Sequence, residues 1–167
     1  MSWISTIRRV GRMVEPAPPA PAPPTLADPT NAVGTPTGVA GSWQLRHVDC
    51  GSCNGCELEI AGAFSSVYDA EQFGVRVVAS PRHADGLITT GVVTHNMHQP
   101  LLNTLSSVPE PRVVIAVGDC AVDGGAFADG YAVVGSVADV IPVDVKVPGC
   151  PPSPAEIIAA LRSVTGR

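Results

Sequence analysis

The 167-residue sequence has few charged side chains, no long apolar run and no excess of positive charge. Charged residues make up only 15% of it, which is little solvating charge for so short a chain and indicates a surface largely covered by partners. The formal net charge of −5 excludes the basic footprint with which nucleic-acid-binding proteins neutralise phosphates. No apolar run approaches the roughly 20 residues that are needed to span a bilayer.

The sequence also lacks the apolar core of an export signal. The Arg8-Arg9 pair is followed by a proline-rich segment that begins near Glu15, where a signal peptide would have an apolar run. We therefore expect a cytoplasmic chain. In that compartment clustered cysteines more often bind metal or do redox chemistry than form structural disulfides.

The first 41 residues are predicted to stand apart from a globular domain at 42–167. Residues 1–14 have the pattern of an amphipathic helix, and 15–41 form a Pro/Ala-rich linker whose prolines keep the backbone extended. We interpret 1–14 as an arm that contacts a partner subunit or an anionic membrane surface; the alternative is a frayed terminus. The apolar face of this arm carries Trp3, Ile7, Val10 and Val14.

Within 42–167, predicted strands alternate with predicted helices. The start of the last helix is predicted by its sequence, with Ser153 as N-cap and Glu156 completing a capping box. This alternation predicts an α/β fold with a mostly parallel sheet and helices on both faces. The glycine-rich segment 123–127 is assigned to no element. Strands are predicted at 44–48, 74–79, 86–90, 112–117 and 144–147, and helices at 56–65, 100–106 and from 154 onward.

The five cysteines follow three of these strands. Cys50, Cys53 and Cys56 form a C-x-x-C-x-x-C run after the first strand, while Cys120 and Cys150 each close a glycine-containing turn after a later strand. Ligands of open parallel sheets bind outside the carboxyl ends of the strands. We therefore expect three distant segments to converge on one site.

Thiolates at such a site suit either zinc or an iron–sulfur cluster. Zinc sites usually pair two C-x₂₋₄-C knuckles, whereas a cubane draws its ligands from several loops. Helix N-termini after Cys56 and after Cys150 would stabilise the negative charge of a cluster. An iron–sulfur cluster is the favoured interpretation; zinc, in an interaction module stapled by the metal, and an unliganded redox set remain alternatives. We interpret His47, His83, His95 and His98 as polar or interface residues and not as ligands.

Three segments, taken in order, resemble the small subunit of [NiFe] hydrogenases, in particular its short group 4, formate-hydrogenlyase-like branch. The same segments resemble the homologous component B of respiratory complex I, an NADH:quinone oxidoreductase. That component carries two adjacent cysteines, and this chain has none, which favours the hydrogenase side. The segments are Cys53-Asn54-Gly55-Cys56-Glu57, Gly118-Asp119-Cys120-Ala121 with Gly124-Gly125, and Pro148-Gly149-Cys150-Pro151-Pro152.

The resemblance implies a flavodoxin-like domain with a single [4Fe–4S] cluster. Mapped onto this sequence, the cluster ligands are Cys53, Cys56, Cys120 and Cys150. Cys50 is then the additional thiol, although a Cys50/Cys53 ligand pair remains an alternative. The residues expected around the ligands are Cys50, Glu57, Gly91, Thr94 and Gly149. For Glu57 the alternative is a carboxylate that only stabilises a helix N-terminus, and for 91–94 it is a plain turn after a strand.

The same resemblance implies an electron-transfer subunit of an oxidoreductase complex that is not catalytic alone. Its expected partners are a large catalytic subunit, similar to that of [NiFe] hydrogenases or to component D of complex I, and ferredoxin-like and membrane subunits of the same complex. The expected location is peripheral, on the cytoplasmic side of the membrane. A quinone oxidoreductase subunit similar to component B of complex I is the alternative.

Overall fold

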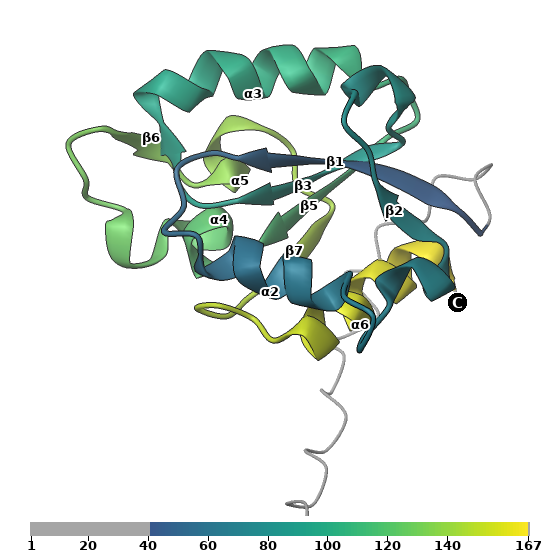
Figure 1. Ribbon diagram of the computed structural model, residues 1–167. Helices are drawn as coiled ribbons and strands as arrows, with labels where there is room; N and C mark the ends of the chain where they lie inside the picture. The colour runs from purple at the N-terminus through teal and green to yellow at the C-terminus, as the bar shows by residue number, and fades with distance from the viewer. Residues whose placement is uncertain (1–40, 167) are drawn as a thin grey trace, which may run out of the picture.

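A parallel sheet of five strands forms the centre of the molecule in the computed structural model, which describes residues 41–166 (Figure 1). The arm expected at 1–14 and nearly all of the linker expected at 15–41 lie outside the described residues. The strands are β1 (Trp43–Asp49), β2 (Val75–Val77), β3 (Gly86–Thr90), β5 (Val113–Val117) and β7 (Val145–Val147).

The order of these strands across the sheet is β2-β1-β3-β5-β7, and every neighbouring pair is parallel. Counted within this sheet alone, that is the 2-1-3-4-5 order of flavodoxin-like folds. All five predicted strands are present, with bounds that differ by a few residues at most. The expected flavodoxin-like α/β fold is confirmed.

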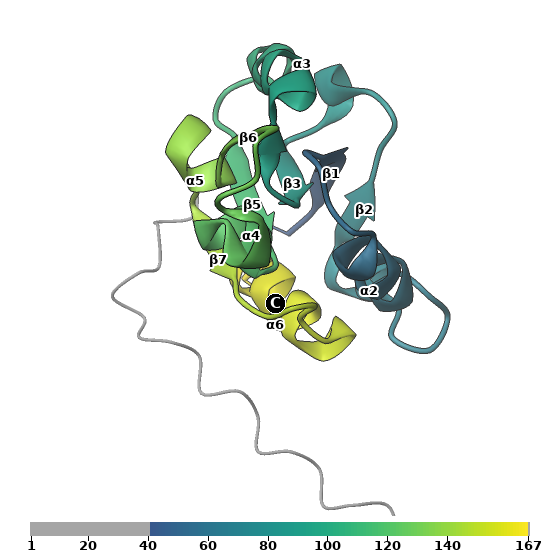
Figure 2. The same ribbon diagram turned by 90° about the vertical axis from the view of Figure 1, so that its left-hand side faces the viewer.

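Helices cover both faces of the sheet (Figure 2). On one face lie α2 (Gly55–Ala63) and α6 (Pro154–Thr165), whose Ile60 and Ile157 belong to one buried cluster. On the other face α3 (His95–Ser107), α4 (Asp119–Asp123) and α5 (Val137–Val140) contribute to a second cluster. The predicted capping box of α6 is present: the Ser153 hydroxyl accepts from the Glu156 N–H and donates to the Glu156 carboxylate.

The central strands are buried along their whole length. Every residue of β3 and β5 is buried, as expected for strands covered on both faces. Because successive side chains of a strand point to opposite faces, Ile88 joins the cluster of α2 and α6, while Leu87 joins that of α3, α4 and α5. The core therefore consists of two layers, one on each side of the sheet.

The segment between β3 and β5 departs from the sequence prediction. The helix expected at 100–106 begins five residues earlier, at His95, because Thr94 is its N-cap and accepts from the Met97 N–H at 3.4 Å. Pro100 lies inside this helix instead of opening it, and leaves one carbonyl of the first turns without its helical donor. Within residues 41–166 no helix is long and apolar enough to cross a membrane.

Several short elements were not predicted from the sequence. The turn expected at 91–94 contains β4 (Val93–Thr94), which pairs antiparallel with β6 (Val133–Gly135) in a second, two-stranded sheet. The glycine-rich segment at 123–127, which was assigned to no element, holds the end of α4 and one of the three short 3-10 helices found in residues 41–166. These are η2 (Ala70–Phe73), η3 (Pro81–His83) and η4 (Gly125–Phe127).

Candidate functional site

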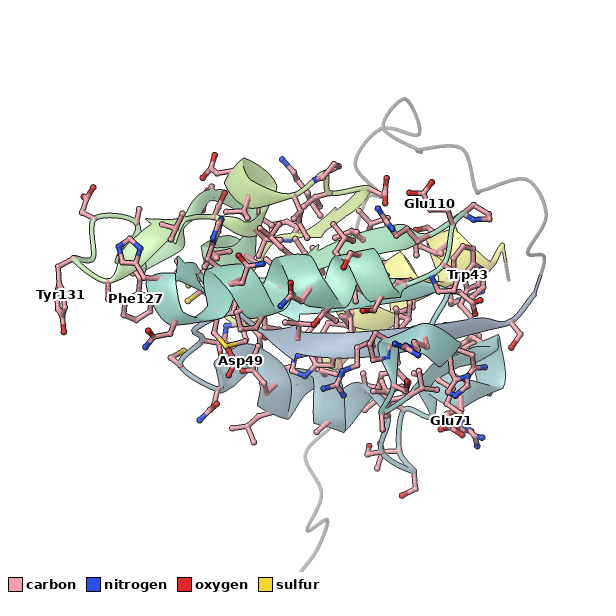
Figure 3. All side chains as sticks on the ribbon, turned by 90° about the horizontal axis from the view of Figure 1, so that it is seen from above. Trp43, Asp49, Glu71, Glu110, Phe127 and Tyr131 are labelled. Atoms are coloured by element: carbon pink, nitrogen blue, oxygen red, sulfur yellow. The ribbon has the colours of Figure 1, made fainter. Side chains whose placement is uncertain are left out.

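Three loops meet at the edge of the sheet where β1, β5 and β7 end. β1 is followed by the loop that carries Cys50 and Cys53 and by α2, which contains Cys56. β5 leads into α4 with Cys120 in its first turn, and β7 leads into the loop that carries Cys150. Figure 3 marks this edge by Asp49, the last residue of β1, and the opposite edge by Trp43.

Four of the five cysteines line one cavity of about 90 Å³ at this edge. They are Cys53, Cys56, Cys120 and Cys150, and the predicted neighbours Gly91 and Gly149 line the same cavity. Cys53 and Cys150 are exposed, Cys120 is half-buried and Cys56 is buried. The structure thus brings together the four thiols that the family resemblance implied as ligands.

Cys50 lies elsewhere. It is fully buried in the cluster of α3, α4 and α5, and its Sγ lies 3.8 Å from the carbonyl oxygen of Val48. Burial is also the main reason why the pKa of this thiol rises to about 12. What sets Cys50 apart is its place: it packs in the core and is not among the residues that line the cavity. The geometry therefore favours the Cys53/Cys56 pair over the Cys50/Cys53 pair.

The thiols of the cavity disfavour one another's ionisation. Burial raises the pKa of Cys56 to about 12, and the negative charges of Glu57 and of the other three cysteines contribute to the rise. Burial, Cys150 and Cys53 likewise raise the pKa of Cys120. Four thiolates can share this space only if positive charge between them offsets the repulsion. Thiols in such a setting become thiolates readily only when a cation binds as the protons leave.

Gly118 and Gly91 bring backbone close to the cavity. Gly118 has φ +91°, and a Cβ there would collide with the Sγ of Cys56. Gly91 has φ +74°, and a Cβ there would collide with the backbone of Ser52. A side chain at either position would therefore push away the loop that carries Ser52 or displace Cys56 itself.

Asp119 joins two of the cysteine loops. Its backbone N–H donates to the Gly149 carbonyl at 2.9 Å, and its Oδ1 accepts from the Gly149 N–H at 2.6 Å. Cys120 and Cys150, the neighbours of these two residues, are thereby held at a fixed separation. Asp119 was not predicted from the sequence as a functional residue; its position between Gly118 and Cys120 was the only available signal.

The loop after β1 is ordered by Asp49 and Thr94. The Oδ1 of Asp49 accepts from the N–H groups of Gly51 and Ser52, both at 2.8 Å. The Cys50 carbonyl accepts from both the N–H and the hydroxyl of Thr94, at 3.0 and 3.2 Å. Thr94 thus holds the loop through the Cys50 carbonyl and is the N-cap of α3. It is not among the residues that line the cavity.

Glu57 lies between the cavity and a larger groove. Its carboxylate accepts from the hydroxyls of Ser52 and Thr90, and lies 3.8 Å from the Nε2 of His47. The groove, of about 350 Å³, is lined by His47, Glu57, Ile60, Ala61, Phe64, Glu71 and Val77. Glu57 is thus more than a helix-end carboxylate, since it links three segments of the chain.

The chain matches a known family over residues 53–164, described as NADH ubiquinone oxidoreductase, 20 Kd subunit. It is 49% identical over 119 residues to formate hydrogenlyase subunit 7 of Escherichia coli (strain K12), a match that covers 71% of this chain and 47% of that protein. It is 46% identical over 112 residues to the probable membrane-bound hydrogenase subunit mbhJ of Pyrococcus furiosus, with 67% of each chain covered. The chain spans about half the length of the Escherichia coli relative.

Two solved structures are similar to this chain in fold. A chain of the archaeal membrane-bound sulfane sulfur reductase superposes with a TM-score of 0.66 at 30% identity, covering 75% of this chain and 70% of that one. A chain of an NAD⁺-reducing [NiFe]-hydrogenase superposes with a TM-score of 0.59 at 20% identity, covering 75% and 93%, a likeness that shows the fold alone. The resemblance expected from the three cysteine segments is confirmed, and the chain belongs to the NADH ubiquinone oxidoreductase 20 Kd subunit family.

Proposed function

We propose that the chain is an electron-transfer subunit that holds one [4Fe–4S] cluster with Cys53, Cys56, Cys120 and Cys150. The observation that carries the proposal is the convergence of these four thiols, from three loops, on one cavity. Cysteine thiolates are the usual ligands of such clusters, and four of them complete one cubane. The glycines at positions 91 and 118 support the proposal, because a side chain at either would displace the loop of Ser52 or Cys56 itself.

Zinc is the less supported ligand. A structural zinc ion needs four ligands at about 2.0–2.3 Å from the metal, which draws the ligand atoms close together. Across residues 41–166, no three side chains of His, Cys, Asp or Glu are grouped closely enough to hold one metal ion. A cubane separates its four ligands more widely than a single ion does. Thiols that stand around a cavity therefore favour the cluster over the zinc-stapled module.

When bound, the cluster would supply one-electron transfer, and the chain itself would supply no acid–base chemistry. The residues of the chain would determine the shape and the water access of the cavity that holds the cluster. Asp119 holds the loops of Cys120 and Cys150 together, and Gly118 lets the end of β5 lie against Cys56. Packing of Cys56 in the core keeps water from one side of the cavity.

We propose further that the cavity face docks on a large catalytic subunit in a membrane-associated complex of the group 4 [NiFe]-hydrogenase type. Apolar side chains are exposed near this edge: Leu58 is 72% exposed and Tyr131 fully exposed. Phe127 and Tyr131 lie at the same end of the molecule as Asp49 (Figure 3). Aromatic residues of this kind are enriched at protein interfaces. The names of the relatives, formate hydrogenlyase and membrane-bound hydrogenase subunits, support the type of complex.

In such a complex the chain would be peripheral, on the cytoplasmic side of the membrane, beside ferredoxin-like and membrane subunits.

A role in a quinone oxidoreductase, like that of component B of complex I, is the second candidate, and the description of the matched family favours it. The two functions differ in the partner. Co-purification of the native complex, followed by nickel analysis of the large subunit, decides between them: nickel supports the hydrogenase type, and its absence together with quinone reductase activity supports the other.

The cluster is tested first on this chain. Anaerobic purification should yield a brown protein with about four iron atoms and four sulfides per chain, as the formula of the cluster requires. A colourless protein with one zinc ion per chain would overturn the proposal in favour of the zinc module.

A further inference from the structure

Two hydrogen bonds from different parts of the chain meet at Glu57, next to Cys56. Its Oε2 accepts from the Ser52 hydroxyl at 2.6 Å, and its Oε1 accepts from the Thr90 hydroxyl. Ser52 belongs to the cysteine loop, whereas Thr90 is the last residue of β3. The side chain of Glu57 is only 20% exposed. A largely buried carboxylate thus bridges the cysteine loop and the sheet.

The Thr90 side of this bridge extends to His47 in β1. The hydroxyl of Thr90 has one hydrogen, which it donates to the carboxylate, because a carboxylate only accepts. The Nε2 of His47, 3.1 Å from the Thr90 Oγ1, must therefore be the donor in that contact. Glu57 is thereby connected to two neighbouring strands, β1 and β3, which pair along most of their length inside the sheet.

The Ser52 side of the bridge orders the backbone on both sides of Cys53. Ser52 donates its hydrogen to Glu57 and accepts from the N–H of Asn54 at 3.1 Å. Asn54 has φ +68°, a left-handed conformation that is uncommon for a residue other than glycine. Ser52 precedes Cys53 and Asn54 follows it, so both neighbours of this exposed thiol are held through one carboxylate.

We propose that Glu57 is a positioning residue for the cluster. Through Ser52 it fixes the direction of Cys53, and its negative charge lowers the reduction potential of the bound cluster. The inference rests on the proposed function. Net charge and hydrogen bonding around a cluster are two determinants of its potential, and a nearby carboxylate favours the oxidised state, which carries one electron less.

Four variants of the full chain separate charge from positioning, among them Glu57→Ala, which removes both the charge and the acceptor of the Ser52 hydrogen bond. Glu57→Gln removes the charge at constant size, and Ser52→Ala keeps the charge but removes the link to the loop. Glu71→Gln is the matched control, because Glu71 lines the same groove but pairs with the exposed Arg76. Each chain is loaded with iron and sulfide under anaerobic conditions and titrated by electron paramagnetic resonance. Amide exchange at Asn54 is measured in the iron-free chains.

We expect Glu57→Gln to shift the midpoint potential of the cluster to a more positive value, and Glu71→Gln to leave it unchanged. Exchange at Asn54 should rise roughly tenfold in Ser52→Ala and also rise in Glu57→Ala, as loss of one hydrogen bond implies, and rise less in Glu57→Gln, whose amide oxygen can still accept from Ser52.

Equal potentials in Glu57→Gln and Glu71→Gln would overturn the role of the charge, and unchanged Asn54 exchange in Glu57→Ala would overturn the positioning role. A wild-type chain that takes up no cluster would overturn the proposed function and the charge effect with it. In that case Asn54 exchange still decides whether Glu57 positions the loop.

Discussion

Asp119 and Gly149 exchange two hydrogen bonds, at 2.9 and 2.6 Å, and so tie the loop of Cys120 to that of Cys150. The two residues are neighbours of the two cysteines that stand alone in the sequence. Neither loop has a second cysteine through which a metal could fix its direction. The Asp119–Gly149 pair supplies the missing constraint from within the protein.

Asp119→Ala should therefore weaken cluster binding. It leaves the Gly149 N–H without its acceptor, which we expect to lower the free energy of unfolding by about 1 kcal/mol. It should also reduce the iron content of the anaerobic protein, because the two loops lose their fixed separation. Asp119→Asn is the matched variant, since its side-chain oxygen can still accept. Equal iron loss in both variants would show that the hydrogen bond is not the cause.

Gly118→Ala should be more destabilising than Gly166→Ala. Both glycines have a left-handed φ, +91° and +72°, so both substitutions strain the backbone. Only at Gly118 does the new methyl group also collide with the Sγ of Cys56, while nothing lies within 4 Å of it at Gly166. We expect an additional loss of roughly 1–3 kcal/mol, measured by urea denaturation of the iron-free chains. Equal losses would mean that the loops adjust freely around the cavity.

His47 makes the stability of the iron-free chain depend on pH. Burial lowers its pKa from the ordinary value of 6.5, although Glu57 and Asp49 oppose the shift. Below pH 6.5 the unfolded chain then binds more protons than the folded chain, so this contribution to stability falls as the pH falls. Between about pH 7.5 and 5.5, which spans the ordinary histidine pKa, His47→Gln should lose less stability than wild type. If wild type and His47→Gln lost the same amount of stability over this pH range, His47 would not be the group responsible for the pH dependence.

The exposed apolar residues at the cysteine edge test the docking proposal. Tyr131→Ala and Leu58→Ala should reduce co-purification of the large subunit while leaving the iron content of the chain unchanged, because neither residue lines the cavity. Val67→Ala is the control, since Val67 is 83% exposed in the turn between α2 and η2. Undiminished co-purification in the first two variants would place the partner on another face.

The sequence predicted the parts of the site that depend on strand ends. β5 reads as an uninterrupted apolar run, and the capping box of α6 follows from Ser153 and Glu156 alone. Because parallel strands place their carboxyl ends together, the meeting of the cysteine loops followed from the strands that precede them.

Contacts between side chains of distant segments could not be predicted in the same way. Glu57 has an obvious local explanation at the start of a helix, and nothing in the sequence indicates that Thr90, at the end of β3, reaches it. The start of α3 was missed because Pro100 resembles a first helical residue, whereas the true N-cap, Thr94, follows glycine and valine residues that suggest a turn. The burial of Cys50 depends on α3 packing over the loop, which local patterns do not encode.

The most direct test of the central claim is the iron and sulfide content of five single Cys→Ala variants of the full chain, purified anaerobically. Cys53→Ala, Cys56→Ala, Cys120→Ala and Cys150→Ala should each lose most of the iron and the brown colour, because each removes a thiol from the cavity. Cys50→Ala should keep both at the wild-type level, since its thiol is buried among the residues that pack under α3. A cluster that is lost in Cys50→Ala and kept in Cys53→Ala would contradict the claim.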